Sequence, residues 1–405
     1  MDRKQLPEGW EITTLGNLCN FVRGPFGGSL TKSCFKMSGY AVYEQQHAIY
    51  DQFENIRYFI DEAKYLEMKR FELFSGDLIM SCSGTMGKVS IVPDGILKGI
   101  INQALLKLSP KKDIVVEFLK YWMNSPNFQM QLNNLSQGVA IKNIASVKIL
   151  KEIQILKPSV DEQKRIVAIL DEAFEGIDQA IRNTEKNLAN ARELFDSYLN
   201  KIFTQKGDGW EEKKLQDICN VKDGTHDSPK YLADGIPFIT QKNIRENGLT
   251  FENIKFISLD DHEKFYTRSN VAFGDILISM IGANRGMAAI VDDRRIFSIK
   301  NVGLIKANNN INKYFLLYFL KSNRAKNYVE LESKGGAQPF IGLGKLREFP
   351  VIVAPQNKQD SIVIELDQLY LETQQLETIY RQKIAALNEL KQSILQKAFT
   401  GQLTK

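Results

Sequence analysis

The chain has 405 residues, 43% of them hydrophobic and 25% charged, so it is long enough for two or more ordinary domains. Its net charge of +5 and pI near 8.7 permit a polyanionic partner without requiring one. No run of about 18 apolar residues is present and no apolar stretch follows the charged N-terminus, so we expect neither a membrane span nor a signal peptide, and a cytoplasmic location.

The opening of the chain occurs twice. GWEITTLGNLCN at residues 9–20 corresponds to GWEEKKLQDICN at residues 209–220. Further matches follow in the same order: SGDLIMSCSGTMG (75–87) with FGDILISMIGANRG (273–286), FLKYWMNS (118–125) with FLLYFLKS (315–322), and LNKIFTQ (199–205) with LQKAFTG (395–401). Several matches in one order predict an internal tandem duplication with a spacing of about 200 residues.

Each half begins with a segment that predicts a compact α/β (mixed α+β) module. Short β-rich runs such as GDLIMS, VSIV, IPFIT and GDILISMI are separated by turn residues. Helical patches follow at 114–124 and 313–321. We therefore expect globular modules at residues 1–157 and 206–356.

Each half ends in a segment that predicts one long helix, at 158–205 and at 357–405. No proline lies between Pro158 and Pro229 or after Pro355. Apolar residues recur at steps of three, four or seven, with charged residues outside that seam, as in a coiled coil. The predicted seam positions are Ile166, Leu170, Ala173, Ile177, Ile181, Leu188, Ala191, Phe195, Tyr198 and Ile202, then Ile362, Leu366, Leu369, Leu376, Leu387, Leu390, Ile394 and Ala398.

The two matching seams predict that the long helices pack on each other, antiparallel because a module separates them in the chain. A helix of about 43 residues is about 65 Å long. This arrangement would separate the two modules under a pseudo-two-fold axis. The alternative for such a stripe is packing within a globular bundle, which the length and the absence of helix breakers disfavour.

The sequence offers little that indicates catalysis. SCSGTMGKVS lacks the glycine and the Ser or Thr that a phosphate loop needs, at Cys82 and Val89, so Gly84 and Gly87 indicate a tight turn between strands. The four cysteines form no CxxC pair and indicate reduced thiols rather than a metal site. Thr, His, Asp and Ser are adjacent in THDS (225–228), but a catalytic triad is a spatial arrangement, so this adjacency does not indicate one. We expect a protein that is not an enzyme and holds no metal.

A duplicated module on stiff helices instead predicts the reading of two sites on a long regular partner, and double-stranded DNA fits because two half-sites at fixed spacing match such a protein. Gln and Asn can bind adenine edges, Arg and Lys guanine edges or phosphates. The candidate DNA-binding residues lie on loops after the repeated anchors: Arg23, Lys32, Lys36, Tyr43, Gln45, Gln46, His47, Lys88, Gln137, Lys142 and Asn143 in the first module, and His226, Lys230, Tyr231, Thr240, Gln241, Lys242, Asn243, Arg245, Arg285, Lys334 and Gln338 in the second. For any single one, a solvated loop residue is an equally good interpretation.

Several segments in order, among them LPEGWEITTLGNLC, DGTHDSPKYLADGIPFITQKNI, DEQKRIVAILD and LNELKQSILQKAFTGQL, resemble the specificity subunit of type I restriction-modification systems over nearly the whole chain. The second half departs from the pattern by lacking the Leu-Pro of LPEGW and the Glu of DEQKR, which could make two docking surfaces unequal.

The resemblance implies two target recognition domains, a bipartite DNA target and a spacer set by the helices. It implies two methyltransferase subunits that modify adenine with S-adenosylmethionine, and restriction subunits that use ATP and Mg, so this chain itself would need no cofactor. The partners would dock on outward positions of 160–204 and 358–400. Two alternatives remain: a coiled-coil scaffold that reads no sequence, and a fused methyltransferase, for which neither an NPPY nor a DPPY motif is present.

Overall fold

A computed structural model describes residues 6–135, 146–205, 207–336 and 338–403. The chain divides into two compact units. Unit 1 combines Met1–Thr184 with Gln382–Lys405, and unit 2 is Glu185–Arg381. Each long helix therefore contributes to both units, and the end of the chain belongs to the unit that contains its beginning.

Unit 1 contains a mixed α/β module. Its strands are β1 (Glu11–Thr14), β2 (Cys19–Arg23), β3 (Tyr40–Tyr43), β4 (Phe59–Ile60), β5 (Leu78–Ser81), β6 (Val89–Ile91), β7 (Gly99–Ile101), β8 (Leu105–Pro110) and β9 (Gln154–Lys157). Its short helices are α1 (Leu15–Leu18), α2 (Gln45–Tyr50), α3 (Glu62–Glu67), α4 (Val116–Met123), α5 (Pro126–Leu135) and α6 (Val147–Lys151). The strands form sheets in the orders β1-β9, β2-β8-β5-β6 and β4-β3-β7.

Unit 2 repeats this topology. Its strands are β10 (Glu211–Lys214), β11 (Cys219–Asp223), β12 (Ile236–Ile239), β13 (Ile244–Arg245), β14 (Gly248–Leu249), β15 (Lys255–Ile257), β16 (Ile276–Ser279), β17 (Ala288–Ile290), β18 (Ser298–Ile299), β19 (Val302–Ala307) and β20 (Pro350–Val353). Its short helices are α8 (Leu215–Ile218), α9 (Leu259–Ser269), α10 (Lys313–Lys321), α11 (Asn323–Glu332) and α12 (Leu343–Arg347). The sheet orders β10-β20, β11-β19-β16-β17 and β15-β12-β18 match those of unit 1, and a β13-β14 hairpin is added.

The predicted duplication and fold class are thus confirmed in the backbone. The runs expected to be strands form β5, β6, β12 and β16, and the helical patches form α4 and α10. Gly84 and Gly87 have φ of 63° and 76° and lie in the turn between β5 and β6, as predicted. Glycine adopts a positive φ at little cost, so these two glycines let the turn reverse the chain without backbone strain.

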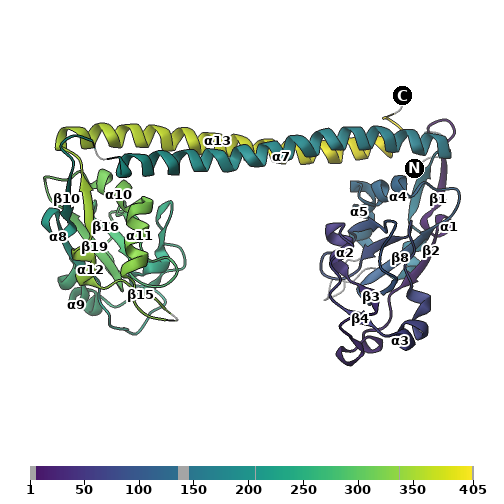
Figure 1. The fold of residues 1–405 in the computed structure, drawn as a ribbon, viewed down its shortest axis with the longest axis horizontal. Coiled ribbons are helices and arrows are strands. Elements are labelled where there is room, and N and C mark those ends of the chain that lie inside the picture. The colour runs from purple at the N-terminus through teal and green to yellow at the C-terminus, as the bar shows by residue number, and fades with distance from the viewer. Residues whose placement is uncertain (1–5, 136–145, 206, 337, 404–405) are drawn as a thin grey trace. The chain divides into compact units, whose positions relative to one another are not determined.

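The long helices are α7 (Val160–Thr204) and α13 (Gln356–Ala398). In each unit, a segment of α7 lies beside a segment of α13 (Figure 1). In unit 2, Arg192 pairs with Glu377 at 3.1 Å, and Tyr198, further along α7, donates to Glu365, further back along α13. The two helix segments in this unit therefore run antiparallel, as predicted.

The same direction holds in unit 1. Lys391 of α13 donates a hydrogen bond to Asp178 of α7. Earlier in α7, Ile166 and Leu170 share a core cluster with Leu395 and other residues near the end of α13. The pseudo-two-fold relation between the two modules stays a prediction.

The predicted seam needs correction on α13. Leu376 and Leu390 are 36% and 46% exposed, so they lie outside the packed face. A spacing of three and four residues instead passes through Thr373, which is 2% exposed, and through Glu377 and Lys391, which form the ion pairs above. The sequence prediction failed here because it followed apolar residues, whereas polar side chains occupy the seam itself.

A buried glutamine joins each module to its long helix. The Oε1 of Gln163 accepts a 2.8 Å hydrogen bond from the backbone nitrogen of Val115, just before α4. In unit 2 the Oε1 of Gln359 accepts a 2.7 Å bond from the nitrogen of Asn312, just before α10. Both glutamines are at most 1% exposed. Each therefore satisfies a backbone donor that would otherwise be buried without a partner.

Candidate nucleic-acid interface

In each unit a pair of parallel strands brings several loops to one edge. In unit 2, β12 and β18 are parallel, and the backbone nitrogen of Lys300, just past β18, donates to the oxygen of Ile239 at the end of β12. Thr225, just past β11, donates to Ile299. Because these strands end together, the loops at 224–235, 240–245 and 300–301 converge. These loops carry most of the candidate residues of the second module.

Unit 1 has the same arrangement around the parallel pair β3 and β7. The nitrogen of Asn102 donates to Tyr43 at 2.9 Å, and that of Gly24 donates to Leu105 at 2.9 Å. A Cβ on Gly24 would lie 1.9 Å from the oxygen of Asn102, so only glycine permits this approach. The corresponding Gly224 would place a Cβ 2.2 Å from the oxygen of Ile299. Both modules therefore fix the same loop by the same close backbone contact.

Many candidate residues are accessible at these loops and turns. Lys32, Lys36 and Lys88 are exposed in unit 1, and Arg23, Gln45 and Gln46 are partly so. In unit 2 the exposed candidates are His226, Lys230, Tyr231, Lys242, Arg245, Lys334 and Gln338, and Thr240 and Gln241 are partly buried. Gln137, Lys142 and Asn143 lie outside the described residues. Contact of the accessible ones with DNA stays a prediction.

Three candidates are buried in the structure, which argues against direct contact with DNA, and their contact stays a prediction. Tyr43 is 0% exposed, and its hydroxyl donates to a backbone carbonyl 2.6 Å away. His47 is 1% exposed, and its Nδ1 lies 2.8 Å from the nitrogen of Glu44, which it caps at the start of α2. Asn243 is 5% exposed and accepts from the nitrogen of Thr240 at 3.1 Å. These polar groups make hydrogen bonds that organise the loops from inside.

Arg285 is largely buried, and its guanidinium is engaged within unit 2. It donates to Ser333 Oγ at 3.0 Å and to the oxygen of Gly282, and it pairs with Glu330 at 2.6 Å. Its side chain is only 14% exposed. Arg285 therefore fixes the glycine turn after β16 against α11, a role that weakens its candidacy for base reading.

The sequence prediction missed two residues that join His226 in one cluster. Asp223, at the end of β11, accepts from His226 Nε2 at 3.0 Å and from Arg268 of α9 at 2.7 Å. Asp223 is 5% exposed, whereas the side chains of His226 and Arg268 are 59% and 50% exposed. No sequence signal links residues 45 positions apart on a strand and a helix, so only the folded chain shows this arrangement.

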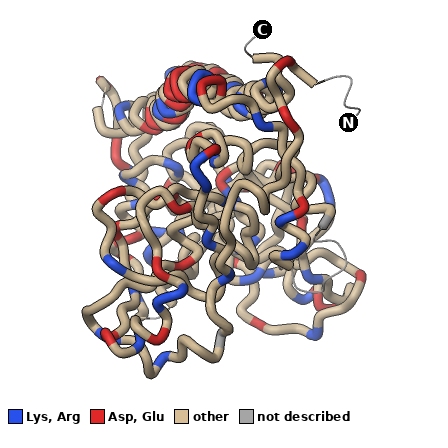
Figure 2. Tube along the Cα trace, turned by 90° about the vertical axis from the view of Figure 1, so that its right-hand side faces the viewer, with Lys and Arg blue, Asp and Glu red and all other residues tan. Residues whose placement is uncertain are grey.

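Charge alone does not mark an interface. Figure 2 shows lysine and arginine scattered among aspartate and glutamate over the units and along the long helices. Individual cations do lie against aromatic rings, as Lys255 does 4.0 Å from the ring centre of Tyr231, which is 38% exposed. Such a pair offers both a charge and a flat apolar surface at the loop between β11 and β12.

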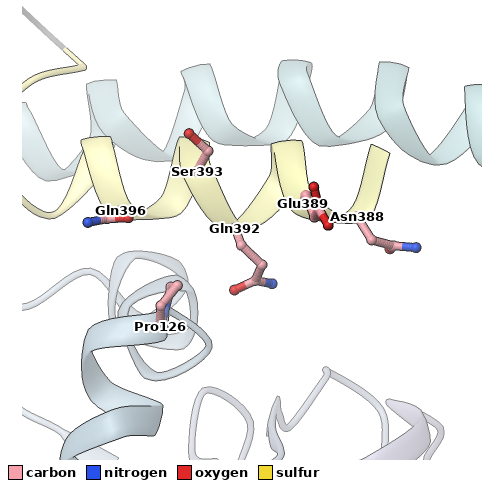
Figure 3. Close-up of a pocket in the computed structure, with 6 residues that line it drawn as sticks. All are labelled: Pro126, Asn388, Glu389, Gln392, Ser393 and Gln396. Atoms are coloured by element: carbon pink, nitrogen blue, oxygen red, sulfur yellow. The ribbon is translucent and has the colours of Figure 1, made fainter. Parts of the chain in front are cut away.

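One hollow in unit 1 has a volume of about 430 Å³. It lies between the start of α5 and α13 and is lined by Pro126, Asn388, Glu389, Gln392, Ser393 and Gln396. Figure 3 shows Gln392 and Gln396 on the side of α13 that faces Pro126. Its lining contains one carboxylate, Glu389, and one hydroxyl, Ser393, with no histidine or cysteine beside them.

Burial suppresses the reactivity of three of the four cysteines. Burial raises the pKa of Cys19, Cys82 and Cys219 to about 12, which keeps these thiols protonated and unreactive. In the described residues no group of three His, Cys, Asp or Glu side chains is placed to hold a metal ion. Within the same residues no helix has the length and apolarity that crossing a membrane requires.

Comparisons with protein families, curated proteins and solved structures all lead to the same family. The family model described as the type I restriction modification DNA specificity domain matches residues 7–189 and again 207–386. Among curated relatives, the type I restriction enzyme MjaVIII specificity subunit of Methanocaldococcus jannaschii is 20% identical and covers 98% of this chain and 94% of its own length. The EcoKI specificity subunit of Escherichia coli strain K12 is 21% identical over 100% of this chain and 91% of its own.

Solved structures share the fold. The HsdS subunit from Thermoanaerobacter tengcongensis aligns with a TM-score of 0.60 at 20% identity and covers 98% of both chains. A chain from a study of complex assembly and conformational transition of the type I R-M system aligns with a TM-score of 0.77 at 20% identity over 98% of this chain and 99% of its own. The two family matches fall on the two halves that repeat in sequence and in topology. The chain therefore belongs to the type I restriction-modification DNA specificity family, with two such domains in tandem.

Proposed function

We propose that this chain is the sequence-specific DNA-recognition subunit of a type I restriction-modification complex and that each unit reads one half-site of a bipartite duplex. The observation that carries the proposal is that both units have one topology but different loops at the edge of the parallel strand pair. The last residue of β2 is Arg23, whereas the last residue of β11 is Asp223. A shared scaffold with different loop chemistry fits the reading of two different sequences.

The long helices supply the fixed spacing in this proposal. A helix keeps its length because each backbone group is bonded within it, so two half-sites would be read at a set separation. The polar seam supports this role: the Arg192–Glu377 and Lys391–Asp178 pairs each fix the register of the helices within one unit.

Outward positions of the long helices, within 160–204 and 358–400, are proposed to dock two methyltransferase subunits, with restriction subunits completing the complex. Apolar side chains are exposed there: on α13 within unit 2, Ile364 and Leu371 are 69% and 57% exposed and lie seven residues apart, hence on one face. Exposed apolar side chains on a helix face are typical of protein contact surfaces.

The chain is proposed to act without an active site of its own. S-adenosylmethionine would bind the methyltransferase subunits, and ATP and Mg the restriction subunits. A location in the cytoplasm follows from the proposed DNA partner. The scaffold alternative explains the helices but not why the two units keep a common core and differ at the loops.

The test is a genome-wide map of methylated adenines in cells that carry the methyltransferase partner, with and without this gene. We expect a bipartite motif only with the gene, and exchange of residues 1–155 for another such module should change one half of that motif. A motif independent of the gene would contradict the proposal. Binding by the purified complex should also fall steeply with salt, because phosphate contacts release counterions.

A further inference from the structure

The cluster after β11 fixes one arginine in a defined orientation. Asp223 Oδ1 accepts from both Nε and Nη2 of Arg268, at 3.1 and 2.7 Å. These two nitrogens form the side edge of the planar guanidinium, so the carboxylate sets both the position and the plane of the group. The carboxylate itself is 6% exposed and lies at the end of a four-stranded sheet, which makes it a rigid support.

The end edge of the Arg268 guanidinium, which does not face Asp223, is available to bind a ligand. Within the described part of the chain, Arg268 makes no hydrogen bond besides those to Asp223. Its end edge, formed by Nη1 and the second N–H of Nη2, therefore presents two parallel donors on a side chain that is 50% exposed. A guanidinium fixed before binding loses little conformational freedom when a ligand engages that edge.

The neighbouring loop is fixed as well. His226 bridges the other carboxylate oxygen, Asp223 Oδ2, at 3.0 Å and Asn301 Oδ1 at 2.7 Å. Two lysines from other elements contact this loop: Lys300, just past β18, donates to Ser228 at 2.6 Å, and Lys264 of α9 lies 3.5 Å from Asp227. These lysines provide positive charge beside the arginine, where the strands of a duplex would place phosphates.

We propose that Arg268 reads a guanine in the half-site of unit 2, through the O6 and N7 acceptors of the major-groove edge, with Asp223 as its positioning residue. This inference rests on the proposed function. Guanine is the base that offers two adjacent acceptors there, whereas adenine pairs one acceptor with a donor. A phosphate can also accept from an arginine fork, but every nucleotide carries one, so a phosphate contact would leave the recognised motif unchanged when Arg268 is replaced.

Unit 1 provides an internal comparison. Arg23 occupies the position of Asp223, directly before the matching glycine, so unit 1 lacks the supporting carboxylate at this position. The predicted guanine contact therefore belongs to one half of the motif. The half read by unit 2 is identified as the half that stays constant when residues 1–155 are exchanged.

The experiment maps methylated adenines in cells carrying the methyltransferase partner and either the native chain, Arg268→Ala, Arg268→Lys or Arg324→Ala. Arg324 is the matched control, since it also pairs with a carboxylate, Glu212 at 2.8 Å, but away from the cluster. We expect Arg268→Ala to lose the preference for guanine at one position of the unit 2 half-site by about tenfold or more, with the other positions retained, and Arg268→Lys to lose less of it, because lysine can also donate to the guanine edge. Lysine keeps the charge and the pairing with Asp223 but lacks the fork.

The outcomes separate the two proposals. A native chain that yields no gene-dependent motif contradicts the proposed function itself. A native motif whose unit 2 half lacks guanine, or an Arg268→Ala motif identical to the native one, overturns the reading by Arg268. Equal weakening at all sequences, without a change of motif, also overturns it, because that is the behaviour of a phosphate contact. Melting temperatures of the purified variants confirm that each is folded.

Discussion

At the scale of single residues, each module contains a lysine and an aspartate joined between adjacent strands. Lys107 of β8 lies 3.7 Å from Asp77 and donates to the oxygen of Glu72 at 2.6 Å, and both charged side chains are at most 8% exposed. The pair in unit 2, Lys306 and Asp275, is closer at 2.5 Å but more exposed. Burial makes a charge without its partner costly, so the two pairs should respond differently to loss of the lysine.

We predict that Lys107→Met destabilises unit 1 by about 3 to 5 kcal/mol, because it leaves the buried Asp77 carboxylate without its cation, held only by hydrogen bonds from Ser109 and the backbone of Phe74. Lys306→Met should cost less, since water reaches that pair. Urea unfolding of both variants measures the difference. The double variant Lys107→Met with Asp77→Asn should recover part of the loss, and no recovery would show that packing rather than charge causes it.

Cysteine reactivity provides a second prediction at this scale. The Thr31 hydroxyl lowers the pKa of Cys34, whereas burial raises the pKa of Cys19, Cys82 and Cys219 to about 12. A lowered pKa means more thiolate at neutral pH, so Cys34 should be alkylated first. Peptide mass spectrometry after brief iodoacetamide treatment at pH 7.5 measures this. Labelling of the other three should require denaturant, and their labelling in the native protein would contradict the structure.

At the scale of elements, α7 carries a glycine that its surroundings do not require. Gly176 lies on the exposed side of α7, and a Cβ there would meet no atom within 4 Å. We predict that Gly176→Ala stabilises unit 1 by about 1 kcal/mol, because alanine loses less backbone freedom in a helix. Thermal unfolding measures the shift. Gly87→Ala is the opposite control: with φ of 76° and Leu132 Cδ2 2.5 Å from the added Cβ, it should destabilise.

The long helices show the limit of periodicity as a signal. Spacing and the lack of proline predicted two helices, and both are present. The seam of α13 was misassigned at Leu376 and Leu390, because Thr373 and Glu377 occupy the packed positions. Which side of a helix is covered depends on its neighbour, and a polar seam is not visible in a pattern of apolar residues.

At the scale of the whole molecule, each long helix ends in the core of a module. Phe399, near the C-terminus, packs 5.2 Å from the ring centre of Phe118 in unit 1. Phe203, at the end of α7, lies 5.3 Å from both Phe315 and Phe319 in unit 2. The repeated motifs LNKIFTQ and LQKAFTG are therefore core elements, and the second completes the module at the opposite end of the sequence.

We predict that Phe399→Ala destabilises unit 1 by about 3 to 5 kcal/mol and that Phe203→Ala does the same to unit 2, because both rings are fully buried. Hydrogen exchange followed by mass spectrometry assigns the loss to segments. Protection should fall around α4 in the first variant and around α10 in the second. Loss around α10 on substitution of Phe399 would contradict the division into units.

The duplication, the two α/β modules, the long helices and the family could all be predicted from the amino-acid sequence, because they depend on local patterns and on motifs repeated in order. The sequence also predicted loop positions for most candidate contacts of unit 2, at the edge of its parallel strand pair. The folded chain was needed to show that Tyr43, His47 and Asn243 are internal and that Asp223 supports Arg268. Burial and pairing arise from contacts between residues far apart in the chain, and a linear pattern records the residue types but not which of them meet.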